Sequence, residues 1–429
     1  MGRVLTLDDV KVDGMTVLAR VDINSPLDPG TGAFLDVTRI AGILPTIRRL
    51  SKAKTVLLCH QSRPGKEDFT TTHSHSRELG RILGRTVKWV EDISGDVALA
   101  AIEELKDGEI LMLNNVRMDD EELTRKNDSF EELSDSRMVV NLASVADLFV
   151  NDAFACAHRN SPSITGFTNV LPCVAGELMR KEIEALQKSM QKPERPSIAV
   201  LGGIKVDDSI AVADNMLRKG TVDGIWVTGG VANLFLSLAG HHPGHASIDF
   251  LAGELGDKWG DTVDLARSLW QDFPELINLP VDVAANVEGN RIDLNLDQLP
   301  ADAPVLDLGV QSTINLSKAI RSAGTVILNG PAGVFEDTNF AFGTVEMLNA
   351  CAESDAYVVI GGGHTATLIS KKGLGGKMGH ISTGGGSCLD FLAGKRLPAV
   401  VSLETSALAF GVDILSESDV VDGSVERIP

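Results

Sequence analysis

The chain has 429 residues and a formal net charge of −20, and no apolar run reaches the length of about 18 residues that a membrane-spanning helix needs. This length predicts two or three domains, and the acidity without a basic stripe argues against a nucleic-acid partner. The five cysteines are scattered with no CxxC pair, and the N-terminus lacks the apolar core of a signal peptide. This combination is typical of a reduced, cytoplasmic protein without a disulfide framework or a zinc site.

Apolar, β-branched runs alternate with helical patterns along the whole chain. In the first part they predict strands at residues 15–21, 55–60, 86–90, 109–114 and 147–152. An amphipathic helix is predicted at 174–191, where the Lys-Pro-Glu-Arg-Pro sequence ends it. The second part predicts strands at residues 197–203, 224–230, 277–283, 303–309, 325–331 and 357–363. We therefore expect two doubly wound, Rossmann-like α/β domains with parallel sheets, at 1–173 and 193–400, joined by a hinge helix at 174–192.

Polar and cationic residues follow the predicted strands of the first domain. They are Arg20, Asp22, Asn24, His60, Arg63, Arg117, His158 and Arg159. Ligands of open α/β sheets bind at these strand ends, and a guanidinium grips a carboxylate or phosphate at two points. The alternative is a set of surface salt bridges, but recurrence at several strand ends favours a site for a small polyanion.

Glycines follow the predicted strands of the second domain instead. They occur at residues 202–203, 229–230, 330, 333 and 361–363, with a further glycine turn at 384–386. Such turns suit a phosphorylated ligand that approaches the backbone closely, whereas a single pair would be explained as a tight turn. One domain for a small acid and one for a nucleotide together favour phosphoryl transfer, with domain closure that excludes water.

Taken together and in this order, the segments RVDINSPLD, HQSRPG, NNVRM, NDAFACAHR, ERPSIAVLGGIKVDDSI, LNGPAGVFE, IGGGHTATL and HISTGGGSCLDFL closely resemble the phosphoglycerate kinase family. The resemblance implies the transferase reaction of glycolysis and gluconeogenesis, in which phosphate passes between 1,3-bisphosphoglycerate and ADP to give 3-phosphoglycerate and ATP. It also implies that the segment at 401–429 returns to the first domain.

Site residues follow from the same resemblance. The acid is expected to be bound by Asp22, Asn24, Arg39, His60, Arg63, Arg117 and Arg159. The nucleotide is expected at Lys205, Gly229, Gly230, Asn329, Glu336, Gly361, Gly362, Gly363, His364, Thr365, Ser382, Thr383 and Gly384. Arg39 and Lys205 are the expected catalytic residues. The acceptor carboxylate is already ionised at neutral pH, so no general base is required.

Two positions depart from the bacterial and eukaryotic pattern of the family. His364 stands where an aspartate helps to hold magnesium, and Ser209 replaces a second lysine. Both changes resemble the archaeal branch. We expect Mg²⁺ to arrive with ADP or ATP, Asp208 to be its protein ligand, and His364 to contact phosphate, because magnesium prefers oxygen ligands.

Alternative interpretations of several motifs remain open. The histidines at 73–75 and 241–245 lack the partners of a zinc site and are expected to be solvated or to begin helices. The GGGHTA sequence also fits a dinucleotide fingerprint, but no acidic strand end follows it, so an NAD-dependent dehydrogenase is the weaker enzyme hypothesis. A two-domain protein that binds an anionic metabolite without turnover is the non-enzyme alternative. We expect a monomer, with a dimer left open.

Overall fold

The computed structural model describes residues 2–300 and 303–418, with only the backbone of His364 and of residues 412–418. The described residues form two compact units: unit 1 contains residues 2–183 and 396–418, and unit 2 contains residues 184–300 and 303–395. No helix among the described residues is long and apolar enough to cross a membrane.

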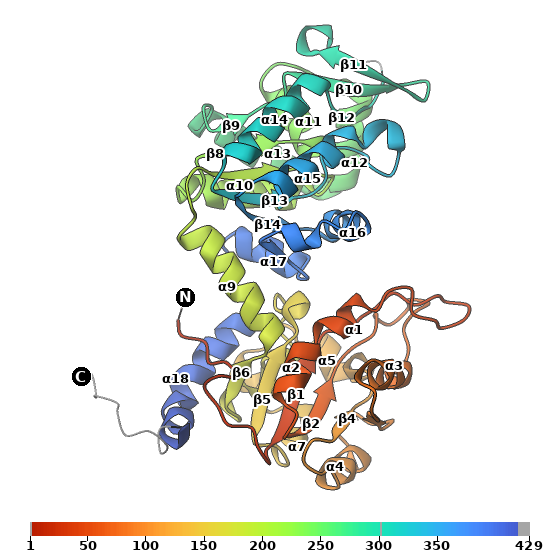
Figure 1. The fold of residues 1–429 in the computed structure, drawn as a ribbon, viewed down its shortest axis with the longest axis vertical. Coiled ribbons are helices and arrows are strands. Elements are labelled where there is room, and N and C mark those ends of the chain that lie inside the picture. Colours follow the sequence, from red (N-terminus) through yellow and green to blue (C-terminus); the bar gives the residue numbers. More distant parts are fainter. Residues whose placement is uncertain (1, 301–302, 419–429) are drawn as a thin grey trace, which may run out of the picture. The chain divides into compact units, whose positions relative to one another are not determined.

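Unit 1 is built on one six-stranded sheet, whose neighbouring strands are all parallel (Figure 1). The order is β3-β4-β2-β1-β5-β6. Its strands are β1 (Thr16–Val21), β2 (Lys54–Leu58), β3 (Lys88–Trp89), β4 (Ile110–Met112), β5 (Leu148–Asp152) and β6 (Cys173–Ala175). Strands β1, β2 and β5 are nearly continuous in buried residues, as expected of strands covered on both faces.

The helices of unit 1 cover both faces of this sheet. They are α1 (Thr38–Gly42), α2 (Leu44–Arg49), α3 (His73–Leu83), α4 (Asp96–Glu103), α5 (Asp120–Thr124), α6 (Phe130–Ser134), α7 (Arg137–Ala143), α8 (Pro162–Thr165) and α18 (Pro398–Ser418). Short 3-10 turns lie at η1 (Val116–Met118), η2 (Phe154–Cys156) and η3 (Gly166–Asn169). On one face Val17, Ala19 and Val21 pack in a single core with Ile40 of α1 and Ile47 of α2. Alternate side chains of β1 therefore pack against α1, the helix that carries Arg39, and fix its position.

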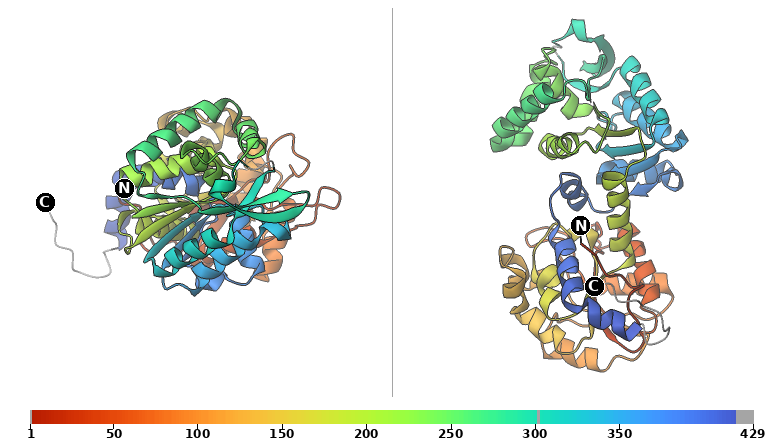
Figure 2. Two further views of the ribbon diagram at one scale, coloured as in Figure 1. Left: turned by 90° about the horizontal axis from the view of Figure 1, so that it is seen from above. Right: turned by 90° about the vertical axis from the view of Figure 1, so that its left-hand side faces the viewer.

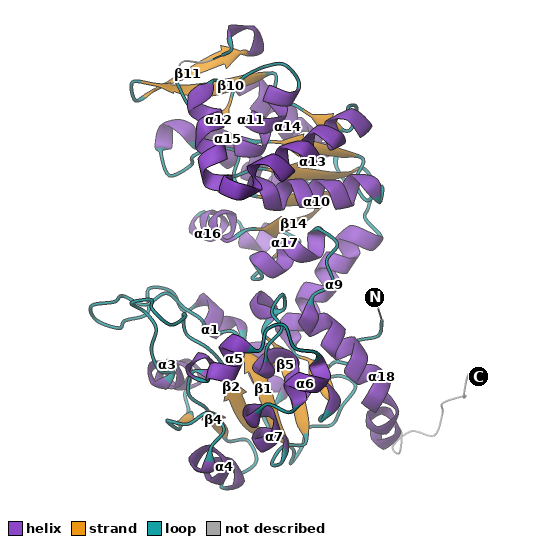
Figure 3. Cartoon of the chain, turned by 180° about the vertical axis from the view of Figure 1, so that it is seen from behind, coloured by secondary structure: helices purple, strands orange, loops and turns teal. Residues whose placement is uncertain are grey.

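Helix α18 belongs to unit 1 although it ends the described chain (Figure 3). The backbone N–H of Cys173 donates to Ser406 Oγ at 2.8 Å, and the hydroxyls of Thr168 and Ser402 are 2.6 Å apart. Both contacts are buried, and they join helix α18 to strand β6 and to the 3-10 turn η3 that precedes this strand.

The junction predicted as one helix at 174–191 is a strand followed by a helix. Val174 and Ala175 lie in β6, and helix α9 (Glu177–Gln191) begins only after Gly176. The prediction is wrong at its start because β6 pairs with β5, a partner distant in sequence, whereas the helical periodicity after it is local.

Unit 2 contains a second six-stranded parallel sheet, in the order β15-β14-β13-β7-β8-β9. Its strands are β7 (Ser197–Leu201), β8 (Gly224–Val227), β9 (Ile277–Asn278), β13 (Thr325–Asn329), β14 (Tyr357–Gly361) and β15 (His380–Ile381). Residues of α14 and α15 pack with Val200, Val326 and Val358 on one face. Helices α10, α11 and α13 lie on the other face (Figure 2). Two doubly wound α/β units are thus confirmed.

The helices of unit 2 are α10 (Val206–Arg218), α11 (Gly229–Leu238), α12 (His245–Leu255), α13 (Trp259–Asp272), α14 (Val310–Ser322), α15 (Phe342–Glu353), α16 (Gly363–Lys371) and α17 (Gly386–Leu392). The 3-10 turns are η4 (Gly256–Lys258), η5 (Leu296–Gln298), η6 (Thr338–Phe340) and η7 (Gly375–Lys377).

The strand predicted at 303–309, and most of the one at 277–283, do not join the parallel sheet of unit 2. A separate antiparallel sheet contains β10 (Asp282–Val287), β11 (Asn290–Asn295) and β12 (Val305–Leu308), in the order β11-β10-β12. Glu288 and Gly289, both at positive φ, form the two-residue turn between β10 and β11. A two-residue turn of this kind is the hairpin signal that distinguishes these strands from those of the parallel sheet.

Candidate functional site

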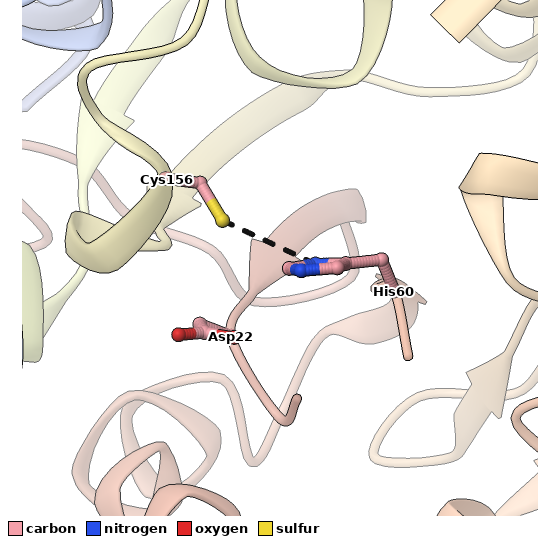
Figure 4. A group of neighbouring side chains, drawn as sticks. All are labelled: Asp22, His60 and Cys156. Carbon is pink, nitrogen blue, oxygen red and sulfur yellow. Dashed lines mark hydrogen bonds between the residues drawn. The ribbon is translucent and has the colours of Figure 1, made fainter. Parts of the chain in front are cut away.

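Three strands of unit 1 bring an acid, a histidine and a cysteine together at their carboxyl ends. Asp22 follows β1, His60 follows β2 and Cys156 follows β5. One ligand atom from each lies within 4.8 Å of the others, and all three residues are buried (Figure 4). Neighbouring parallel strands end at the same edge of a sheet, so residues far apart in sequence meet there.

Arg39 contributes a cation to this edge from helix α1. Its Nη1 pairs with Asp22 Oδ2, while Asp22 Oδ1 accepts from the backbone N–H of Asn24 at 3.1 Å. Asp22 is buried and the Arg39 side chain is 38% exposed, so Asp22 orients a guanidinium that solvent and ligands can still reach. Burial lowers the pKa of Arg39.

The loop after β2 adopts an unfavourable backbone conformation that neighbouring site residues stabilise. Ser62 has a φ of 56°, rare for a residue with a side chain. Its N–H donates to Asn24 Oδ1 at 2.8 Å, and its carbonyl accepts from Arg117 Nη1. Strain of this kind concentrates at functional sites, where surrounding contacts enforce it. Asn24 and Arg117 therefore shape the loop that presents Arg63.

His60 is surrounded by cations. Burial lowers the pKa of its imidazole well below the ordinary value, and Arg20, Arg159 and Arg39 lower it further. The imidazole is consequently neutral at physiological pH. Burial, together with Arg20 and Arg63, also lowers the pKa of Arg159. Guanidinium groups in such proximity repel a metal ion, so the Asp22, His60 and Cys156 group is better suited to a polyanion than to a cation.

Two features of this edge differ from the sequence interpretation. The sequence groups Arg20 with the strand-end cations that favour a polyanion site, yet the structure shows it almost completely buried and in contact with His60. His75 begins a helix as expected, but it is buried rather than solvated, and its Nε2 lies 2.9 Å from Gln61 Oε1. Only the tertiary fold reveals either burial.

In unit 2 the glycines link strand ends to one another. The N–H of Gly203 donates to the carbonyl of Pro331 at 2.9 Å, that of Gly229 to Ala332 at 3.1 Å, and that of Gly230 to Gly203 at 3.1 Å. These N–H groups are therefore already paired within the protein. A Cβ on Gly230 would lie 2.8 Å from the Gly203 carbonyl oxygen, so the glycine is needed for close backbone approach.

A cavity of about 610 Å³ lies beside these turns. Its lining includes Gly203, Ile204, Gly229, Gly230, Asn233, Ser247, Phe250, Leu251, Val305, Pro331, Gly333, Val334 and Glu336. Ile204, Phe250 and Val334 are large apolar side chains that remain substantially exposed. Exposed apolar groups around a concave surface, with an acid at its rim, match the needs of a flat base and a ribose.

A second glycine turn leads from β14 into helix α16. Gly362 has a φ of 87°, and the helix begins at Gly363. Thr365 Oγ1 in the first turn is buried and has no hydrogen-bond partner within the described part of the chain. The side chain of His364 lies outside the described residues. An unpaired hydroxyl and a helix N-terminus are compatible with a phosphate.

The neighbouring polar residues support these turns. Asn329 at the end of β13 donates from Nδ2 to Ser209 Oγ at 3.3 Å. Ser382 Oγ accepts from the N–H of Gly384 at 3.0 Å, which closes the turn before α17. Thr383 lies in the same turn and is exposed. Ser209, found where a lysine was expected, is thus a buried link between α10 and β13.

Lys205 and Asp208 lie at the start of α10. Lys205 is exposed at the N-cap position, and Asp208 is in the first turn. Burial raises the pKa of Asp208, and the adjacent Asp207 raises it further. Asp207 is itself paired with Lys258, at 2.6 Å. A half-buried carboxylate beside a second carboxylate is a site that a bound cation would stabilise.

The structure thus has two doubly wound α/β units, one with cations at its strand ends and the other with glycines around a cavity. The family model described as phosphoglycerate kinase matches residues 7–395. The chain belongs to the phosphoglycerate kinase family. It is a phosphotransferase, and the reaction of its family is reversible phosphoryl transfer between 1,3-bisphosphoglycerate and ADP.

Named relatives agree with this assignment. Phosphoglycerate kinase from Methanothermobacter thermautotrophicus is 46% identical over 403 residues, which cover 94% of this chain and 97% of the relative. The Methanosarcina mazei enzyme is 44% identical, with 94% and 95% covered. The crystal structure of phosphoglycerate kinase from Pyrococcus horikoshii has a TM-score of 0.86 at 39% identity, covering 95% of this chain and 100% of that one. The dehydrogenase and binding-protein alternatives are therefore rejected.

Proposed function

We propose that unit 1 binds the phosphoglycerate and that unit 2 binds the nucleotide. The observation that carries this proposal is the contrast between their strand ends. Guanidinium groups of Arg39, Arg63, Arg117 and Arg159 suit the carboxylate and phosphate of a small acid. The apolar cavity with Glu336 at its rim suits a base and ribose, and the start of α16 suits the phosphates.

In the proposed mechanism, Arg39 stabilises charge on the transferred phosphoryl group. Its pairing with Asp22 limits the rotation of the guanidinium while leaving part of it exposed. The acceptor carboxylate needs no base, so catalysis depends on positioning and on compensating negative charge. Lys205, exposed at the start of α10, would extend to the nucleotide phosphates from the other unit. Asn24, His60 and Arg117 hold and orient the acid.

We further propose that Mg²⁺ accompanies the nucleotide and that Asp208 is its protein ligand. The carboxylate offers the hard oxygen that magnesium prefers, and its raised pKa indicates that the ionised form lacks sufficient compensation. Bound Mg²⁺ would neutralise phosphate charge during transfer. Asp207 is less suitable because Lys258 already pairs with it.

The wider proposal is a cytoplasmic monomer that acts on metabolites and not on nucleic acid. All five cysteines lie among the described residues, are buried and form no disulfide, which is compatible with a reducing compartment. Helix α9 has residues in both units and is the proposed hinge. Sedimentation of the purified chain would test the monomer, since a dimer would double the apparent mass.

The decisive experiment is a coupled assay of ATP formation from 1,3-bisphosphoglycerate and ADP over a range of Mg²⁺ concentrations. Asp208→Asn should require at least about tenfold more Mg²⁺ for half-maximal rate, as expected for loss of a charged ligand. Asp207→Asn is the matched control, because it also removes one charge but spares the proposed ligand, and it should raise the requirement clearly less than Asp208→Asn does. Equal behaviour of the two variants would remove Asp208 from the metal site, and absence of ATP formation by the wild-type chain would refute the proposed function.

A further inference from the structure

Arg20 is a buried cation to which the proposed binding scheme gives no role. It is 2% exposed and lies on β1, between β2 and β5 in the sheet. Burial of an arginine is costly unless each part of the guanidinium finds a partner. Nη1 donates to the carbonyl of Val21 at 2.7 Å, and Nε donates to Ser163 Oγ at 3.0 Å.

The remaining nitrogen of Arg20 meets the proposed substrate histidine. Nη2 lies 3.2 Å from Nδ1 of His60. A guanidinium can only donate, so Nδ1 must be the acceptor in this hydrogen bond. The proton of the neutral ring is then on Nε2. Cys156 Sγ lies 4.0 Å from the same Nδ1, a longer contact that does not replace the arginine.

Ser163 holds Arg20 in this orientation through a relay of hydrogen bonds. Its hydroxyl accepts from Arg20 Nε and donates to Glu122 Oε1 at 2.7 Å. The other oxygen of Glu122 accepts from the backbone N–H of Ser163 at 2.9 Å, and Ser161 Oγ donates to Oε1 at 2.8 Å. Glu122 is therefore a buried acceptor that orients Ser163, which in turn receives Nε. Rotation of the guanidinium away from His60 would break these contacts.

We propose that Arg20 is a positioning residue that sets the tautomer of His60, so that the ring presents an Nε2–H donor to an anionic oxygen of phosphoglycerate. The other tautomer would place a lone pair on Nε2 and would repel that oxygen. Arg20 thus acts through His60 and does not contact the substrate. The proposal deepens the function proposed for unit 1 and rests on the assignment of His60 to the acid.

The tautomer of the wild-type protein can be measured directly. In a sample with ¹⁵N-labelled histidine, long-range ¹H–¹⁵N correlation distinguishes a protonated from an unprotonated ring nitrogen, and the His60→Gln variant assigns the resonances. We expect a protonated Nε2 and an unprotonated Nδ1 in the absence of ligands. A protonated Nδ1 would overturn the role of Arg20 while leaving the binding of the acid to unit 1 intact.

Two variants test the consequence for binding. In Arg20→Met we expect His60 to populate both tautomers and the KM for 3-phosphoglycerate to rise roughly tenfold, the equivalent of one hydrogen bond, with an unchanged KM for ATP. Arg20→Lys keeps the charge and a donor, and should recover part of the loss. His60→Gln also keeps a donor near the Nε2 position. Adding Arg20→Met to His60→Gln should therefore raise the KM for 3-phosphoglycerate by less than Arg20→Met raises it in the wild-type protein.

Thermal unfolding identifies variants that fail to fold, and the measurement on the wild-type protein needs no variant. If Arg20→Met is folded and shifts the tautomer but leaves the KM for 3-phosphoglycerate unchanged, the assignment of His60 to the acid is wrong and the proposal fails with it. If both KM values rise equally, Arg20 has a general structural role and the proposal is refuted.

Discussion

Replacing Asp152 by asparagine should flatten the dependence of stability on pH. Asp152 ends β5 and is buried, and its Oδ1 accepts from the N–H groups of Leu178 at 2.9 Å and Met179 at 3.1 Å, in the first turn of α9. Oδ2 is buried without a hydrogen-bond partner among the described residues. Burial raises the pKa of this carboxyl from 3.8 to about 7, against the opposing effects of Thr46 and the two N–H groups.

The direction of this pH dependence follows from the protonation of Asp152 in the folded and in the unfolded protein. Between pH 3.8 and about 7 the folded protein holds a proton on Asp152 that the unfolded chain has released. The stabilising effect of this proton is complete below the unfolded pKa and is lost as the pH rises through the folded pKa. Over the whole window the loss is roughly 4 kcal/mol, and between pH 5 and pH 8 it is about 2–3 kcal/mol.

Asparagine keeps an acceptor for the first turn of α9 but cannot ionise. Its amide group would occupy the position of the unpaired Oδ2, which adds a cost of about 1–3 kcal/mol that does not vary with pH. The diagnostic quantity is therefore the slope of the free energy of unfolding against pH. Urea unfolding of both proteins between pH 5 and pH 8 should show the variant gaining about 2–3 kcal/mol relative to wild type.

Asp147→Asn, at an exposed position before the same strand, controls for loss of a negative charge. Parallel pH profiles for wild type and Asp152→Asn would mean that the N-terminus of α9 keeps the carboxylate ionised, and would refute the reasoning.

The other predictions concern ligands. Arg39→Ala should lose about 2–4 kcal/mol of transition-state stabilisation, seen in kcat, while the Kd for ADP stays unchanged; a normal kcat would remove Arg39 from the mechanism. Gly230→Ala should weaken ADP binding, measured by calorimetry, because its Cβ would lie 2.8 Å from the Gly203 carbonyl oxygen and 2.9 Å from Leu251 Cδ2; unaltered affinity would show that the turn can yield. His364→Ala should weaken nucleotide binding by about 0.5–1.5 kcal/mol without changing the Mg²⁺ requirement, and a raised requirement at unaltered affinity would instead assign His364 to the metal. If α9 is a hinge, small-angle scattering should give a smaller radius of gyration with both ligands bound, and an unchanged value at saturation would contradict a large motion.

The local pattern of the sequence is sufficient for the fold class, whereas the family follows from the resemblance of its ordered motifs. Runs such as 15–21 and 325–331 are apolar and β-branched because parallel strands are buried on both faces, and this burial leaves a signal in a few consecutive residues. The residues that follow each strand can also be identified from their neighbours in the sequence. The sequence by itself therefore reveals the contrast between arginines in unit 1 and glycines in unit 2. The roles of Arg39, Lys205 and the other site residues stay predictions.

Tertiary structure decides the features that depend on partners distant along the chain. Strands β10 and β12 pair with each other and not with the parallel sheet, a choice made by non-local hydrogen bonds. The N–H of Gly203 is paired with the carbonyl of Pro331, so these glycines serve close approach of strand ends rather than supplying free donors. The burial of Arg20 arises in the same way, because strand β1 becomes central only when β2 and β5 pair on either side of it. A sequence records which groups each residue carries, whereas folding determines which of those groups are already paired and which remain for a ligand.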